Sequence, residues 1–281
     1  MTVRIVTDSA CDLDADEAEE LGIEIVPLSI RFGDEEYTDR VDLSVSDFYA
    51  KLASSDTLPE TAAPSPGAFE AAFRRLAEDG ADEIVCINLS LDLSATGQAA
   101  RSAATAVADV VSVRCIDSHS ITAGLGTIVL EAARAARDGA DADRIEQLVA
   151  SLISRTRVFG VLDTLDNLKK GGRIGAAKAL LGTVLSFKPC LDLSSGSVVE
   201  AGRQRTRKKA VAWLRDIVAD AGPIEKLSII HGEAPDLDDF VTLVSDIVPR
   251  DQQRISTLGA VIGTHGGPRV LGVCFLAPEE G

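Results

Sequence analysis

The stretch between residues 83 and 108 constrains the fold more than any other part of the chain. Glu83–Asn88 is a short apolar run after a turn signal at Gly80, and an alanine-rich segment begins at Ala99. This succession predicts a buried strand, a loop and a helix. Ligands of open α/β sheets gather beyond the carboxyl ends of the strands, so the loop Leu89–Gln98 is a candidate binding site.

Ser94 lies within this loop and is predicted to be the N-cap of the helix. A helix N-terminus offers free backbone N–H groups and the positive end of the helix dipole, which suits an anion. Ser94 and Thr96 then act as hydroxyl donors to an anionic group. The loop alone fits plain capping without a ligand at least as well.

The composition allows a large core and excludes several classes of partner. The chain has 281 residues, is 46% hydrophobic and carries a formal net charge of -16. This charge argues against a nucleic-acid-binding or anionic-membrane-binding surface. The five cysteines form no C-x-x-C pair, and the start of the chain reads as a strand rather than a signal peptide. We expect a cytoplasmic protein with reduced thiols and no metal site.

Predicted strands and helices alternate along the whole chain, and the alternation restarts at Arg157. This favours two units, residues 1–156 and 157–281. Lys188–Leu193 and Ser197–Gly202 are predicted to form a hairpin, and Ala260–Thr264 is predicted to be a strand. Gly124-x-Gly126 lacks the third glycine of a dinucleotide-binding fingerprint, and the sequence contains no Walker A motif.

Two Asp-Ser pairs follow predicted strands. Asp8-Ser9 comes after Val3–Val6, and Asp117-Ser118 comes after Val110–Ile116. The carboxyl ends of parallel strands meet at one edge of a sheet, so these polar groups are expected to gather there. Helix capping at both places explains the pairs equally well.

Seven short segments together resemble the DegV family across essentially the whole chain. They are Val6–Ser9, Ile25–Leu28, Thr61–Ser65, Leu93–Thr96, Lys170–Ile174, Arg205–Ala210 and His265–Pro268. The resemblance implies an α/β protein of two domains. The N-terminal domain is a three-layer domain with a parallel sheet, and the C-terminal α/β domain has a mixed sheet.

The resemblance also implies a function. Members of the family look like acyl-carrier subunits that bind a long-chain fatty acid and present its carboxyl group to a separate kinase subunit, without a cofactor. Thr61, Ser94, Ala95, Arg173 and His265 are then expected to bind the fatty-acid carboxylate. Taken singly, these residues also fit structural roles, such as a core histidine or an arginine that closes a helix end.

Four residues depart from the family pattern. Alanine stands at 62 and 63 and glycine at 97, where the family usually has polar or aromatic residues, and Arg269 replaces a glycine. These changes leave the preferred acyl-chain length and the partner open.

A basic run stands out against the acidic background. It contains Arg203, Arg205, Arg207 and Lys208, and we expect Arg205 and Arg207 to be exposed. One interpretation is a docking surface for the kinase subunit, and the other is an ordinary solvated face.

Two enzyme functions are the alternatives to a carrier. Ser94, His265 and either Asp8 or Asp117 would be the parts of a hydrolytic triad, although Ser94 lies outside a G-x-S-x-G motif. A small-molecule kinase is the other alternative, because the fold looks similar to one domain of dihydroxyacetone kinases. The chain lacks the glycine-rich phosphate loop that would support it.

Overall fold

A sheet of four parallel strands lies in the N-terminal domain of the computed structural model, which describes residues 1–180 and 187–279. Its order is β2-β1-β6-β7. The strands are β1 (Val3–Asp8), β2 (Glu24–Val26), β6 (Glu83–Asn88) and β7 (Ser112–Asp117). The two central strands, β1 and β6, are buried along almost their whole length, as expected for a parallel sheet with both faces covered.

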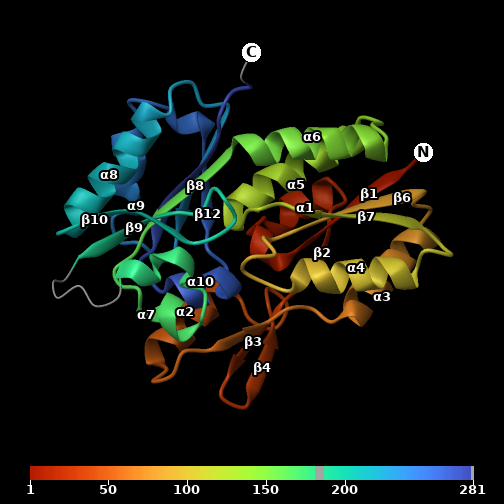
Figure 1. The fold of residues 1–281 in the computed structure, drawn as a ribbon, viewed down its shortest axis with the longest axis horizontal. Helices are drawn as coiled ribbons and strands as arrows, with labels where there is room; N and C mark the ends of the chain where they lie inside the picture. Colours follow the sequence, from red (N-terminus) through yellow and green to blue (C-terminus); the bar gives the residue numbers. More distant parts are fainter. Residues whose placement is uncertain (181–186, 280–281) are drawn as a thin grey trace.

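Helices cover both faces of this sheet, so that it forms the middle of three layers (Figure 1). They are α3 (Pro66–Glu78) and α4 (Thr96–Ala106) on one face, and α5 (Thr122–Arg137) and α6 (Ala142–Arg155) on the other. Successive side chains of β6 point to opposite faces of the sheet. Ile84 packs with Phe69 and Phe73 of α3, whereas Val85 packs in the core around α5.

The C-terminal domain contains a mixed sheet of six strands in the order β10-β9-β8-β13-β11-β12. The strands are β8 (Thr156–Val161), β9 (Lys188–Asp192), β10 (Val199–Gln204), β11 (Lys226–His231), β12 (Gln253–Thr257) and β13 (Leu271–Leu276). β11 and β12 pair in parallel, and the other neighbours pair antiparallel. The predicted α/β fold with a parallel and a mixed sheet is confirmed, whereas the division after residue 156 stays a prediction.

One face of the mixed sheet is covered by α8 (Arg207–Asp220) and α9 (Leu237–Val244). Leu214 of α8 and Phe240 of α9 pack there with alternate residues of the strands, including Val161 and Val273. The opposite face is turned towards α5, which also contacts the parallel sheet. This helix therefore lies between the two sheets.

A third, three-stranded sheet has the order β4-β3-β5. Its strands are β3 (Ser29–Phe32), β4 (Glu35–Thr38) and β5 (Glu60–Ala62). The apolar run Ile23–Ile30 is divided around Pro27 because proline cannot donate to a strand ladder, and β2 and β3 belong to different sheets. Ser44 caps α2 (Val45–Ser54) by accepting a hydrogen bond from the Asp47 amide at 3.1 Å.

The prediction of a strand over Ala260–Thr264 is wrong. Ala260–Gly266 forms helix α10, and its Thr264 hydroxyl donates to the Ala260 carbonyl at 2.8 Å. Short apolar runs do not separate a strand from a buried helix, and packing decides here. A Cβ at Gly263 would lie 2.8 Å from Phe48, so α10 packs unusually close to α2.

Five short helices complete the described fold. They are η1 (Ser9–Cys11), α1 (Ala15–Glu20), α7 (Asp166–Lys170), η2 (Gly175–Leu180) and η3 (Arg250–Gln252). The sequence also predicts a helix over 176–185; its first half is η2, and its second half lies outside the described residues. Among the helices of the described ranges, none has the length and apolar character needed to cross a membrane.

Candidate functional site

A cavity of about 920 Å³, counted to its open mouth, lies between the two larger sheets. Leu89 and Leu93 enter it from the loop after β6, and Ile121 enters from the start of α5. Val158 and Leu191 belong to the opposing face of the mixed sheet. The mainly apolar lining suits an apolar ligand.

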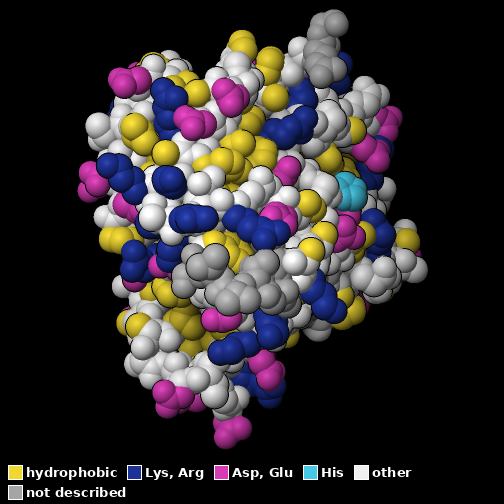
Figure 2. Space-filling model, turned by 60° about the vertical axis from the view of Figure 1, so that its left-hand side comes forward, with side chains coloured by type: hydrophobic (Ala, Val, Ile, Leu, Met, Phe, Trp, Pro, Cys, Tyr) yellow, Lys and Arg dark blue, Asp and Glu magenta, His cyan; other side chains and the backbone are white. Residues whose placement is uncertain are grey.

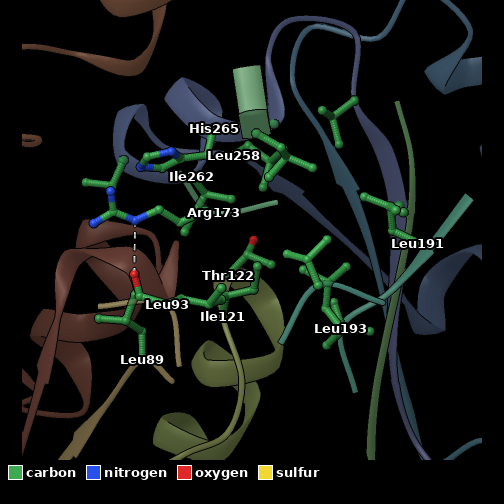
Figure 3. A pocket seen from close by; sticks show the side chains of 18 of the residues that line it. Leu89, Leu93, Ile121, Thr122, Arg173, Leu191, Leu193, Leu258, Ile262 and His265 are labelled. Carbon is green, nitrogen blue, oxygen red and sulfur yellow. Dashed lines mark hydrogen bonds between the residues drawn. The ribbon is translucent and has the colours of Figure 1, made fainter. Parts of the chain in front are cut away.

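Arg173 and His265 lie side by side at one end of the cavity (Figure 3), and two hydroxyl-bearing side chains join them there. Thr61 comes from β5, Ser94 from the loop after β6, Arg173 from the segment after α7, and His265 from α10. The structure thus brings together four of the five residues predicted to bind a carboxylate. The fifth, Ala95, is exposed and is not part of the cavity lining.

Two backbone carbonyls orient Arg173. Its Nε donates to Leu93 O at 3.3 Å, and Nη1 donates to Gly171 O at 2.8 Å. The first bond ties the guanidinium to the loop that carries Ser94, as Figure 3 shows. A positive charge is therefore fixed at the end of an apolar cavity, where a bound anion would meet it.

His265 lies beside Arg173 and is joined to Thr61 by a hydrogen bond of 2.9 Å between Nε2 and Oγ1. No described residue provides a hydrogen-bond partner for its Nδ1. A Cβ at position 171 would lie only 2.3 Å from this Nδ1, so the imidazole position requires Gly171. This close approach explains one of the two glycines in the segment Lys170–Arg173.

The pKa of His265 is lowered to about 4, because burial disfavours the imidazolium form and the charge of Arg173 repels it. The ring is therefore neutral at physiological pH, and one nitrogen can still donate a hydrogen bond. Arg173 thus supplies the positive charge at this end of the cavity, and His265 and Thr61 supply neutral polar groups.

Ser94 is not the N-cap of α4, contrary to the prediction. The N-cap is Ala95, and Ser94 precedes it. The Ser94 hydroxyl accepts a hydrogen bond from the Thr96 amide at 3.3 Å and shares one of 2.9 Å with the Thr96 hydroxyl. The helix begins one residue later than an N-cap at Ser94 would place it, and Ser94 lines the cavity.

The two Asp-Ser pairs hold this loop in place. Asp8 accepts hydrogen bonds from the Leu89 amide at 2.9 Å and from the Asn88 side chain at 3.0 Å. Asp117, at the end of β7, accepts one from the Leu91 amide at 3.3 Å. The carboxylates therefore gather at one edge of the sheet, as predicted, and bind backbone next to the site.

The hydrolytic triad considered above is not assembled in this geometry. The hydrogen bonds of Asp8 and Asp117 go to the loop backbone and to nearby residues of their own edge. His265 bonds Thr61, and the Ser94 hydroxyl bonds Thr96. Across the described parts of the chain, no group of His, Cys, Asp and Glu is arranged to hold a metal ion.

The basic run does not present four free cations. Arg207 makes a two-pronged ion pair with Asp236, with both N–O distances 2.8 Å, so the expectation that its guanidinium is exposed is wrong. Arg203 pairs with Glu200 at 2.6 Å. Arg205 and Lys208 are exposed. Arg205 follows β10 and Lys208 belongs to α8, elements on the side of the molecule that Figure 2 brings forward, where many Lys and Arg side chains are exposed.

The sequence predicts the polar end of the cavity but not its apolar walls. The walls come mainly from Leu28, Val158, Leu162, Leu191, Ile230, Leu258 and Val270. Of the four departures from the family pattern, Ala62 and Ala63 line the cavity, whereas Gly97 packs against Leu91. Arg269 forms an ion pair of 3.2 Å with Asp163.

Comparison with known proteins places this architecture in a family. The family model described as "Uncharacterised protein, DegV family" matches residues 2–278. A DegV domain-containing protein of Halalkalibacterium halodurans is 36% identical over 279 residues, which cover 97% of this chain and 98% of the relative. The chain belongs to the DegV family. This confirms the resemblance seen in the seven sequence segments.

Two solved structures of the DegV family have the same fold. One, described as "Fatty Acid Binding of a DegV family Protein from Thermus thermophilus", superposes with a TM-score of 0.89 at 31% identity and covers 99% of this chain and 100% of that one. The other, "DegV, a fatty acid binding protein from Bacillus subtilis", has a TM-score of 0.87 at 29% identity, with 99% and 100% of the two chains covered.

Proposed function

We propose that this chain binds a long-chain fatty acid in the cavity between its sheets and presents the carboxyl group to a separate fatty acid kinase subunit, which makes the acyl phosphate. The observation that carries this proposal is an apolar cavity that ends at Arg173, Thr61, Ser94 and His265. The DegV family structures described as fatty acid binding support the choice of ligand.

The chemistry of a fatty acid matches the two ends of the cavity. Burial of an apolar tail contributes about 0.8 kcal/mol per methylene, so a dozen methylenes contribute roughly 10 kcal/mol before the costs of binding. A carboxylate that leaves water needs charged or polar donors. Arg173 and the hydroxyls of Thr61 and Ser94 provide them. The tail thus supplies most of the affinity, and the polar end selects an acid.

A carrier role fits the polar end better than catalysis does. The Ser94 hydroxyl is held by Thr96, and His265 is oriented by Thr61 rather than by a carboxylate. A nucleophile in a triad needs a hydrogen bond to its base and an acid that orients the base. Turnover of fatty acyl esters by the pure protein, or acyl phosphate formed without a kinase, would contradict the carrier role.

Presentation to a kinase requires a docking surface, and the exposed Arg205 and Lys208 are the candidates from the basic run. Reversing both charges, Arg205→Glu with Lys208→Glu, should lower kcat/KM for acyl-phosphate formation roughly tenfold at low salt, because docking loses favourable electrostatics. The loss should shrink as salt rises. The assay contains the partner kinase subunit, ATP and magnesium.

A matched control reverses two exposed arginines of the N-terminal domain, Arg101→Glu with Arg144→Glu. The change in net charge is the same, so an effect of overall charge would appear in both variants. Fatty-acid content should stay unchanged in both. Equal kinetic losses in the two double variants would show that the basic run is a solvated face rather than a docking surface.

A further inference from the structure

Two glycines occupy the middle of a row of residues that crosses the mixed sheet. The register pairs Leu191 of β9 with Gly160 of β8, Gly160 with Gly272 of β13, and Gly272 with Ile230 of β11. Glycine weakens the interior of a strand because it has no side chain to pack. Where it does occur there, it often marks a bulge or the close approach of a ligand or another backbone. This pair of glycines therefore needs a specific explanation.

Both glycines face the cavity. Along β8, Val158 and Leu162 belong to the cavity-side core, whereas Val161 packs under α8. Side chains alternate along a strand, so the missing side chain of Gly160 is on the cavity side. The same alternation applies to Gly272, and both glycines line the cavity. They leave a bare strip of backbone between Leu191 and Ile230, which we call the glycine trough.

The two glycines are there for different reasons. A Cβ at position 272 would lie 2.6 Å from Phe159 O, so close approach of the two backbones explains Gly272. A Cβ at position 160 would have Leu271 O at 3.9 Å as its nearest neighbour, which is ordinary contact. The backbone thus tolerates a side chain at 160, and the space that this side chain would fill belongs to the cavity.

The trough lies away from the polar end. Figure 3 shows Leu191 and Leu193 on the opposite side of the cavity from Arg173 and His265. Because Gly160 pairs directly with Leu191, the trough is on that far side. A ligand whose carboxylate binds Arg173 would reach the trough with its tail.

We propose that the glycine trough holds the distal methylenes of the acyl chain and that the absence of a side chain at Gly160 sets the longest chain that the cavity accepts. This inference rests on the proposed fatty-acid binding. Each buried methylene contributes about a fourfold factor in affinity. A valine at 160 that displaces two to three methylenes should therefore weaken binding of octadecanoic acid roughly 15- to 60-fold.

The test compares wild type, Gly160→Val and Gly160→Ala after removal of bound lipid. Each is titrated with dodecanoic, tetradecanoic, hexadecanoic and octadecanoic acid. The control is Gly202→Ala in β10 of the same sheet, whose Cβ would meet Cys190 and Trp213 at 3.8 and 4.0 Å on the α8 side. Circular dichroism checks the fold, and valine suits a strand position.

The inference predicts that Gly160→Val loses affinity for octadecanoic acid but keeps that for dodecanoic acid within about threefold, while Gly202→Ala follows wild type. A loss that is equal for all four acids, or no loss, would overturn it. If Gly160→Val does not fold, Gly160→Ala provides the test. Its affinity should fall about fourfold, and only for the longest acids. Wild type that binds none of the acids would instead refute the proposed function itself.

Discussion

Replacing Arg173 with alanine should lower the affinity for a long-chain fatty acid about a hundredfold. Its guanidinium is fixed by Leu93 O and Gly171 O at the polar end of the cavity. Burial is the main cause that lowers the pKa of His265, and it persists when Arg173 is removed, so this histidine is expected to stay neutral and not to replace the lost charge. Removing the charged partner of a desolvated carboxylate costs about 3 kcal/mol, which corresponds to a factor of about a hundred.

The matching fatty alcohol separates recognition of the carboxylate from damage to the cavity. It has the same tail and no charge, so Arg173→Ala should change its affinity by less than about threefold. Arg173→Lys keeps the charge but loses the planar fork, and its affinity for the acid should be intermediate. Isothermal titration of both ligands gives the comparison. Equal losses for acid and alcohol would show that Arg173 only supports the loop around Leu93.

Replacing Asp39 with asparagine should stabilise the protein at pH 7.5 and have little effect at pH 4. Asp39 is buried close to Asp8, Asp12 and Arg40, and burial raises its pKa to about 6. An ordinary aspartate in the unfolded chain ionises near pH 4, so the folded state holds a proton that the unfolded state releases between about pH 4 and 6. Stability is therefore lost as the pH rises through this range, and the variant avoids the loss.

At pH 7.5 the free energy of unfolding of Asp39→Asn should exceed that of wild type by about 2 kcal/mol. This value follows from a pKa shift of about two units, reduced because the surroundings of the buried charge relax. Urea unfolding at the two pH values measures it. Asp42 is the matched control, because it is exposed and the amide and hydroxyl of Thr38 lower its pKa. Asp42→Asn should shift stability at neutral pH in the opposite direction. Destabilisation by Asp39→Asn at pH 7.5 would show that the charge is compensated.

The local order of apolar and polar residues along the chain is sufficient to predict much of the fold. The strand and helix between residues 83 and 108 were predictable because an apolar run and an alanine-rich segment are separated by a clear loop. The strand prediction for Ala260–Thr264 failed because five apolar and small residues fit a strand and a buried helix equally. The close packing of Gly263 on Phe48, which favours the helix, joins residues that are far apart in sequence.

The site was predictable only in part, for the same reason. The head-group residues came from matching short segments to the DegV family, and the structure adds contacts that spacing cannot show. The Thr61–His265 hydrogen bond joins residues 204 positions apart, and the pairing of Arg207 with Asp236 removes a cation from the expected exposed run. One feature of the sequence does point to the apolar walls. Gly160 and Gly272 interrupt apolar strands, and a glycine inside a strand often marks the close approach of a ligand or another backbone.

The most direct test of the account is the lipid content of the purified protein. The protein is extracted with organic solvent, and the extract is quantified by mass spectrometry against the amount of protein. Delipidated protein is then offered long-chain fatty acids in solution. The account predicts a long-chain fatty acid at about one molecule per chain, because a cavity with this apolar lining binds its ligand by burying the tail. An extract without stoichiometric fatty acid, together with no uptake of added acid by the delipidated protein, would contradict it.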